Sequence, residues 1–270
     1  MAQLHPSDPS SRVAAWLSAL ESRHLADLRV AEVTRALRAL SSAYVERRHK
    51  VASGGTLDSA GKRAAFALYY GPLHFLATAH VLAQLGAGRP SRIVDLGCGT
   101  GVAGAAWALR SADAPPALTG IDRHPWAVEE TRRTYRDLGL AGHARVGDLI
   151  RVPPLDGADA VLAGYLLNEL NEAARRQLED HLAQAAAAGA QVLIMEPIAR
   201  GVAPWWDAMA TRFTAVGARA DEWRFQPDVP DIVAKLGKAA GLNFREVRLR
   251  TLYAGPLSAS ANARSSKSST

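Results

Sequence analysis

The chain has 270 residues, enough for one α/β domain with additional helices or for two small domains. Apolar residues make up 48% of it and charged residues 21%, as in globular proteins, which excludes extensive disorder. Its single cysteine, Cys98, excludes both a disulfide framework and a zinc site built from cysteines.

The first residues and the lengths of the apolar segments indicate where in the cell the protein is expected. The N-terminus, MAQLHPSDPSSR, has no apolar stretch of the kind found in a signal peptide. No apolar run approaches the roughly 18 residues that a membrane-spanning helix needs. We therefore expect a soluble, cytoplasmic protein that makes no contact with a membrane.

The formal net charge of +6 is unevenly distributed. Residues 1–92 carry 12 lysines and arginines against 6 acidic residues, whereas residues 93–255 are close to neutral. A basic N-terminal third could face an anionic partner such as RNA or the ribosome. The alternative is an ordinary solvated helical surface rich in arginine, which we favour because there is no long basic run.

The N-terminal third is predicted to be helical, since apolar residues recur at three- and four-residue steps. The composition of 52–61 indicates a loop, and Gly71-Pro72 is expected to interrupt the aromatic-rich segment that follows. We interpret residues 1–88 as a helical extension that forms a cap. Its helices are expected over 11–21, 25–48 and 62–86.

From Arg92 onward, short apolar strands alternate with helical segments, which indicates βαβ units and a mostly parallel sheet with helices on both faces. This α/β domain is expected over 89–255, and the polar tail 256–270 is expected to be disordered. The predicted strands are 93–96, 118–121, 144–146, 160–164, 192–195 and 244–249. The predicted helices are 101–111, 125–138, 171–188, 203–216 and 229–240.

The most informative segment is IVDLGCGTGVAGAAWAL (93–109), in which a buried strand runs through a glycine-rich turn into a helix. Glycines let a ligand approach the backbone closely, and the carboxyl ends of parallel strands are where such sheets bind ligands. The spacing Gly99-x-Gly101-x-x-Gly104 matches a dinucleotide fingerprint. Asp95 argues against that interpretation, because a carboxylate there repels a pyrophosphate and attracts a cationic ligand.

The segment VDLGCGTG resembles the first motif of class I S-adenosylmethionine-dependent methyltransferases, and the resemblance extends from residue 92 to about 196. It implies a Rossmann-like fold whose sheet has seven strands, the final one antiparallel. The sequence leaves open whether that last strand is present. In this family the acidic residue and the glycine turn hold the methionine part of the cofactor. The matching residues are Asp95, Gly97, Cys98, Gly99 and Gly101.

Two more acidic residues at strand ends support the resemblance. Asp122, in LTGIDRHP, matches the residue that binds the ribose hydroxyls, and a carboxylate accepts such donors readily. Arg123, which follows it, is expected to flank the adenine together with the next residue, a histidine. Asp148, in RVGDL, matches the residue that reads the adenine amine, and Leu149 is expected to form an apolar wall. The cofactor implied is S-adenosylmethionine.

The catalytic group stays unknown from the sequence, because transfer from an activated sulfonium mainly requires alignment. His74 is a candidate base, since imidazole titrates near neutral pH, although a packed histidine is the alternative. Tyr165 ends the fourth strand and is expected to contact the cofactor, to orient an acceptor or to form a pocket wall. Tyr69 and Tyr70 are predicted substrate contacts together with His74. No clustered spacing of histidines and carboxylates indicates a metal site.

Two acceptor classes are excluded by the residues around the fourth strand. The segment AGYLLNEL lacks the Asn/Asp-Pro-Pro-aromatic tetrad of methyltransferases that act on exocyclic amines. Cytosine C5 methylation needs a nucleophilic cysteine near that strand, and Cys98 lies in the cofactor turn instead. Glu169 is interpreted as support for the helix start, and Glu196 as either support or a substrate contact.

Three functions remain. We favour methyl transfer to an O or N atom of a small molecule, because the aromatic segment 66–75 could line an organic acceptor pocket. DAVLAGYLLNEL with AQVLIMEPIARG is similar to a methyltransferase-like family associated with the mitochondrial small ribosomal subunit, which suggests contact with small-subunit RNA. That family typically carries cysteines that bind a metal cluster, and this chain lacks them. A protein that binds the cofactor without catalysis is the third.

Overall fold

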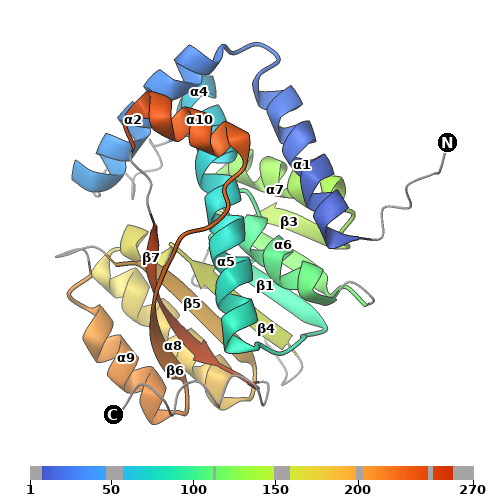
Figure 1. Cartoon of the computed structure of the whole chain (residues 1–270). Helices are drawn as coiled ribbons and strands as arrows, with labels where there is room; N and C mark the ends of the chain where they lie inside the picture. Colours follow the sequence, from blue (N-terminus) through green and yellow to red (C-terminus); the bar gives the residue numbers. More distant parts are fainter. Residues whose placement is uncertain are drawn as a thin grey trace.

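The computed structural model describes residues 8–46, 57–111, 114–148, 159–198, 203–242 and 246–257. Its centre is a seven-stranded sheet with the strand order β3-β2-β1-β4-β5-β7-β6 (Figure 1). Strands β1 to β5 pair in parallel, while β7 is antiparallel to both β5 and β6. The strands are β1 (Arg92–Leu96), β2 (Ala117–Asp122), β3 (Gly142–Val146), β4 (Asp159–Gly164), β5 (Gln191–Pro197), β6 (Arg219–Phe225) and β7 (Val247–Ala254).

The sheet therefore has the seventh strand that the sequence left open, but the strand missed by the pattern is β6 and not one that follows β7. β6 lacks an apolar run because it lies at the edge of the sheet, where every second residue is exposed. It is held to its neighbour by a ladder from Arg219 to Phe225 and by the Trp223 indole, which donates to Thr251 Oγ1 over 2.9 Å.

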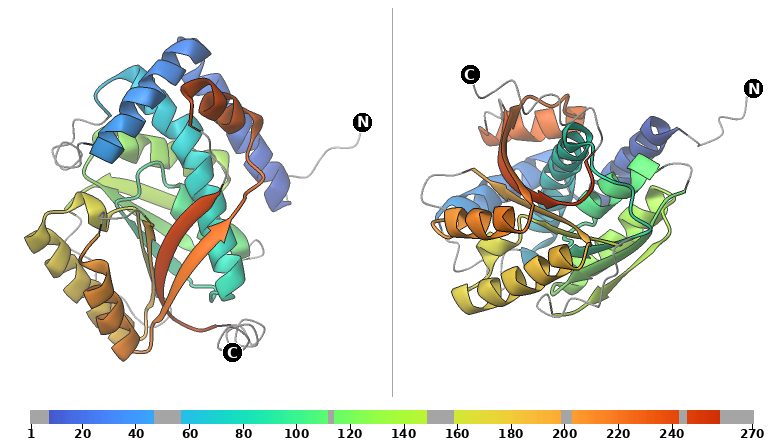
Figure 2. Two further views of the ribbon diagram at one scale, coloured as in Figure 1. Left: turned by 60° about the vertical axis from the view of Figure 1, so that its left-hand side comes forward. Right: turned by 90° about the horizontal axis from the view of Figure 1, so that it is seen from below.

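Helices cover both faces of the sheet, as expected for the Rossmann-like class I methyltransferase fold. Helices α8 and α9 lie on one face, and α5, α6 and α7 lie on the other, so that three layers are seen (Figure 2). Helices α1, α2, α4 and α10 gather beyond one end of the sheet (Figure 1). The bounds are α1 (Pro9–His24), α2 (Val30–Glu46), α4 (Ala60–Ala65), α5 (Gly71–Leu85), α6 (Val102–Ala108), α7 (Pro125–Asp137), α8 (Glu172–Ala187), α9 (Trp206–Ala215) and α10 (Asp231–Ala240).

The apolar strands supply both layers of core because successive side chains point to opposite faces. On β4, Leu162 packs in the cluster beneath α5 and α6, whereas Val161 and Ala163 pack in the cluster beneath α8 and α9. Neighbouring β5 alternates in the same way, with Leu193 on the first face and Ile194 on the second. A strand buried on both faces reads as a continuous apolar run, which is why β1, β2, β4 and β5 were recognisable in the sequence.

The predicted interruption of the helix at Gly71-Pro72 is wrong. α4, a π-helical turn at Phe66–Tyr70 and α5 follow one another without a break. The N–H of Gly71 donates to the Phe66 carbonyl, so the turn before Pro72 is wider than an α-helical turn. The wider turn avoids the clash that proline otherwise makes with the carbonyl four residues earlier. It also places the aromatic residues of this segment beside the carboxyl ends of the strands.

Two helices that are far apart in the chain, α2 and α10, pack together beyond the sheet. α10, which lies between β6 and β7, packs on α2, and its Ile232 and Leu236 belong to the same buried cluster as Leu37. The guanidinium of Arg38 on α2 donates to the carbonyls of Ala239 and Ala240 at the end of α10. An apolar face and a capped helix end thus hold these two distant segments together.

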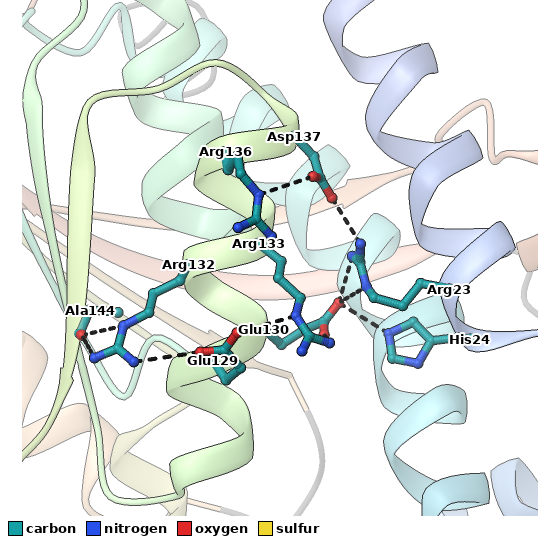
Figure 3. Close-up of polar contacts among 9 residues, drawn as sticks. All are labelled: Arg23, His24, Glu129, Glu130, Arg132, Arg133, Arg136, Asp137 and Ala144. Carbon is teal, nitrogen blue, oxygen red and sulfur yellow. Dashed lines mark hydrogen bonds and ion pairs between the residues drawn. The ribbon is translucent and has the colours of Figure 1, made fainter.

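An ion cluster fixes α1 against α7 (Figure 3). The carboxylate of Glu130 is fully buried and accepts hydrogen bonds from Arg23, at 2.8 Å, and from His24 Nε2, at 3.0 Å. Arg23 also pairs with Asp137 at 3.0 Å. Burial raises the pKa of Glu130, but His24 and Arg23 outweigh it and hold that pKa below its usual value. Glu130 therefore stays ionised, and α1 is tied to the helix that follows β2.

No helix in the described part of the chain combines the length and the apolar character needed to cross a bilayer.

Candidate functional site

The glycine-rich turn links β1 to α6 and lies at the carboxyl end of the parallel strands. Gly97, Gly99 and Gly101 all have positive φ angles, of 63°, 55° and 75°, which only glycine adopts without strain. The N–H groups of Gly97 and Cys98 donate to the carbonyl of Ile121 on β2, at 2.8 and 3.2 Å. The turn is therefore bound to the neighbouring strand.

The glycines of the turn have different neighbours. A Cβ on Gly101 would lie 2.6 Å from Thr131 Cγ2 and 3.0 Å from Tyr135, both on α7, so this glycine permits helix packing. A Cβ on Gly99 would meet the Phe66 ring at 3.5 Å, an ordinary van der Waals contact. Gly99, unlike Gly101, lines a cavity, where its missing side chain leaves room for a ligand.

Asp95, on β1 just before the turn, is 1% exposed. Its carboxylate accepts a hydrogen bond from the N–H of Gly104 on α6, at 3.0 Å. Burial raises the pKa of Asp95 to about 7, although the bond from Gly104 opposes the shift. The carboxyl group thus holds the first turn of α6 against the strand while it lines the cavity.

Asp122 ends β2 and organises the next turn. One carboxylate oxygen accepts the N–H of Gly99, at 2.9 Å, and the other accepts the N–H of His124, at 2.8 Å. Burial raises the pKa of Asp122 despite these two bonds. Each oxygen keeps a further lone pair for a ligand hydroxyl. The carboxylate therefore joins the glycine turn to the start of α7 and also faces the cavity.

These groups surround a cavity of about 340 Å³. The glycine turn and Asp122 form one wall, and the segment after β4 forms the other. Two buried polar atoms on the lining, Thr100 Oγ1 and Asn168 Oδ1, have no hydrogen-bond partner among the described residues. Buried polar groups without a partner are rare, so both atoms indicate a polar ligand. The aromatic lining residues are Phe66, Tyr70, His74, His124 and Tyr165.

Tyr165 follows β4 and is the one non-glycine residue with a positive φ, of 59°, in the described part of the chain. Its N–H donates to the Met195 carbonyl, at 2.7 Å, which holds this conformation. Its ring stacks on His74 of α5, with centroids 3.9 Å apart and planes at 11°. Burial lowers the pKa of His74 to about 4 and raises that of Tyr165, so both rings are neutral near pH 7.

Glu196, at the end of β5, is fully buried. It accepts the N–H of Leu167, at 2.7 Å, and the side-chain amide of Asn168. Burial raises the pKa of Glu196 to about 8, and the two hydrogen bonds only partly offset this. Glu196 therefore supports the turn after β4, which is one of the two roles that the sequence analysis considered for it. Since it also lines the cavity, the sequence-based alternative of a substrate contact is still open.

Replacing Glu196 by glutamine is expected to change how stability depends on pH. The folded wild type keeps the Glu196 proton up to about pH 8, while the unfolded chain releases it near 4.5. The free energy of unfolding therefore falls as the pH rises through this window, by up to ~1.4 kcal/mol per pH unit, and levels off above it. Glu196→Gln removes this contribution.

Urea unfolding of both proteins from pH 5 to 9 measures the difference in unfolding free energy. That difference should shift in favour of Glu196→Gln as the pH rises to about 8. Exposed Glu172 provides the matched control, since Glu172→Gln should follow the wild type at every pH. A constant difference between Glu196→Gln and the wild type would show that Glu196 is ionised throughout.

The structure gathers most of the predicted residues around the cavity. Asp95, Gly97, Cys98, Gly99, Asp122, Arg123, Tyr165, Tyr70 and His74 all line it. Arg123 lies 3.7 Å from Glu169 across the rim, and burial raises the pKa of Glu169 to about 7. The thiol of Cys98 contacts Thr131 Oγ1 at 3.3 Å, and burial raises its pKa well above the usual value.

Four predicted residues are not among the described residues that line this cavity. Gly101 is one of them, since it faces Thr131 and Tyr135 of α7 instead. Tyr69 is buried beside Gly237 of α10 and does not line this cavity. Asp148 is exposed after β3 and is not among the lining residues, and Leu149 lies outside the described residues. The candidates missed by sequence reasoning are Phe66 and Thr100. The sequence held a signal for both, because Phe66 belongs to the aromatic segment 66–75 and Thr100 lies within the glycine-rich turn.

The strand order, the antiparallel β7 and the glycine turn facing a cavity form the Rossmann-like arrangement expected for a class I S-adenosylmethionine-dependent methyltransferase. Residues 93–189 match the family described as "Methyltransferase domain". The matched region runs from β1 through α8 and contains all three acidic strand ends. Within the described ranges, no group of three His, Cys, Asp or Glu side chains is placed to hold a metal ion.

Relatives match parts of the chain. The ribosomal RNA large subunit methyltransferase G of Streptomyces coelicolor is 46% identical over 77 residues, which are 28% of this chain and only 20% of that protein. An Aquifex aeolicus SAM-dependent methyltransferase is 16% identical, covers 68% of this chain and 92% of its own, and has a TM-score of 0.44. A TehB-like methyltransferase from Corynebacterium glutamicum is 18% identical over 81% and 99%, with a TM-score of 0.43.

Proposed function

We propose that the cavity binds S-adenosylmethionine and that the chain transfers its methyl group to an O or N atom of a small molecule. The observation that carries the proposal is the pairing of the glycine turn with Asp122, whose carboxylate reaches both the turn and the start of α7. Asp122 would accept the ribose hydroxyls, and Arg123 would flank the adenine. The backbone at Gly99, which lines the cavity without a side chain, and the unpartnered Thr100 hydroxyl would receive the polar end of the cofactor.

When bound, the cofactor supplies a methyl group on a sulfonium, which is already activated for in-line displacement. The chain's own residues then have to bind, align and exclude water. The turn after β4 and α5 face each other across the cavity through Tyr165 and His74. Neutral His74 can accept a hydrogen bond from the acceptor's O–H or N–H, which would turn the reacting lone pair toward the methyl group.

Two measurements, made one after the other, test this function. Calorimetric titration with S-adenosylmethionine should give saturable binding, and NAD at the same concentrations should give none. A screen of phenols and amines with radiolabelled methyl donor should then give a labelled product whose formation falls in His74→Phe. Binding of NAD in place of S-adenosylmethionine would contradict the cofactor assignment, and label transfer only to RNA would contradict the acceptor class.

RNA is the second candidate acceptor. Its support is the similarity of 77 residues to a relative named as a ribosomal RNA methyltransferase, together with the basic residues of the N-terminal third. Phosphate contacts release counterions, so binding of RNA would weaken steeply with salt. Retention of ribosomal RNA on the immobilised protein at low salt and its loss near 0.3 M salt would favour this function. The same label transfer assay, run with RNA, distinguishes binding from methylation.

A further inference from the structure

A second cavity, of about 470 Å³, lies next to the first. The two cavities share three lining residues, Tyr70, His74 and Tyr165. The stacked rings of His74 and Tyr165, with centroids 3.9 Å apart, therefore stand between them. Tyr69, which the sequence predicted as a substrate contact and which is absent from the first cavity, lines the second.

The walls of the second cavity come from segments far apart in the chain. Ser41 contributes from α2, Leu73 and Ala77 from α5, Leu242 from just after α10, and Val247 from the start of β7. None of these residues is among those that line the first cavity. A ligand held here would be bound independently of the cofactor groups.

The lining has a distinct chemical character. Rings and aliphatic side chains predominate, and its two charged residues, Glu246 and Arg248, pair with each other. Burial keeps the Tyr70 phenol neutral by raising its pKa to about 12. The His74 imidazole and the Tyr165 hydroxyl make no hydrogen bond with the described residues, and neither is closed off from solvent. An uncharged ring with one hydrogen-bonding group would satisfy all of these features.

We propose that the second cavity binds the methyl acceptor, an uncharged planar aromatic molecule with a hydroxyl or amino group. This inference rests on the proposed function, because it places the acceptor of that reaction. The ring packs among Tyr69, Tyr70 and Leu73, and the hydroxyl or amino group reaches the His74–Tyr165 pair at the boundary. Its oxygen or nitrogen then faces the cofactor cavity.

Methyl transfer to this acceptor needs no reactant other than the cofactor. A lone pair on the acceptor oxygen or nitrogen forms the new bond to the methyl carbon. The bond from that carbon to sulfur breaks, its electron pair stays on sulfur, and the product is a neutral thioether. The acceptor's proton passes through its hydrogen bond to His74 and from there to solvent. His74 starts neutral and is neutral again at the end.

The test uses 2-naphthol, phenol and indole as probes, with the full chain saturated with S-adenosylhomocysteine. Saturation-transfer NMR measures probe binding, and calorimetry measures cofactor binding. Ser41→Trp fills the second cavity from α2, and Leu242→Trp fills it from the end of α10. Ser42→Trp is the matched control, because Ser42 is exposed and lines neither cavity. Ser41→Ala controls for loss of the hydrogen bond between Ser41 and Tyr70.

We expect probe affinity to fall at least tenfold in Ser41→Trp and in Leu242→Trp, to fall clearly less in Ser41→Ala, and to stay within twofold of wild type in Ser42→Trp. Affinity for S-adenosylhomocysteine should stay within twofold in all four variants. Probe binding unchanged by both filling variants, or displaced by the cofactor, would overturn the assignment. If the cofactor does not bind at all, the proposed function fails, while the probe series still reports on the second cavity by itself.

Discussion

Asp122→Ala should weaken the binding of S-adenosylmethionine by about 100-fold or more. The variant loses the proposed acceptor for the ribose hydroxyls, and a hydrogen bond to a charged group contributes about 1.5–3 kcal/mol. It also leaves the N–H groups of Gly99 and His124 without the partner that fixes the turn. Since each ~1.4 kcal/mol is tenfold in affinity, the two effects together account for at least two orders of magnitude.

Calorimetric titration measures this change. Asp180→Ala on the outer surface of α8 is the control and should bind as the wild type does, because Asp180 is exposed, pairs with Arg212 and is not among the residues that line the cavity. Asp148→Ala gives separate information. A loss above about tenfold there would support the predicted contact with the adenine, although the exposed side chain lines no part of the cavity. If Asp122→Ala bound S-adenosylmethionine with an affinity within threefold of the wild type, the proposed ribose site would be contradicted.

Gly101→Ala should destabilise the fold by about 3 kcal/mol. The backbone at Gly101 has a φ of 75°, where a residue with a Cβ costs roughly 1–2 kcal/mol. The added Cβ would also lie 2.6 Å from Thr131 and 3.0 Å from Tyr135, which are buried and leave little room to shift. Overpacking of this kind costs about 1–3 kcal/mol more.

Gly241→Ala separates the two contributions. Its φ is 74°, nearly the same as at Gly101, but no atom lies within 4 Å of the added Cβ. Urea unfolding should therefore show a loss of only about 1–2 kcal/mol for Gly241→Ala, and a clearly larger loss for Gly101→Ala. Equal losses would mean that α7 moves to accommodate the methyl group and that packing against the turn is loose.

The strands that the sequence revealed most clearly are those buried on both faces, although the mostly exposed β3 and part of β7 were also predicted. β1, β2, β4 and β5 are continuous apolar runs, and the glycine turn directly after β1 fixed the class of fold. β6 was missed because an edge strand with alternating charged residues has no such run. The continuous helix through Gly71-Pro72 was also unpredictable, because a π-helical turn follows from packing and leaves no signature in local composition.

The cofactor side of the site was more predictable than the acceptor side. Asp95, Asp122 and the glycines lie at strand ends, so the order of elements alone brings them together. The stacking of His74 on Tyr165 joins residues 91 positions apart and depends on how α5 lies over the sheet. The support of the turn after β4 by Glu196 depends likewise on tertiary packing, so the sequence could only leave its role open.

The packing of α10 on α2 also sets the order in which the molecule can be completed during synthesis. Arg38 and the carbonyl of Ala240 to which it donates are 202 residues apart. At about 5–20 residues per second, a ribosome needs on the order of 10–40 s to make the intervening chain. For that time the nascent α2 has no partner for the face that α10 later covers. The N-terminal helices therefore emerge first and are among the last parts to be fully buried.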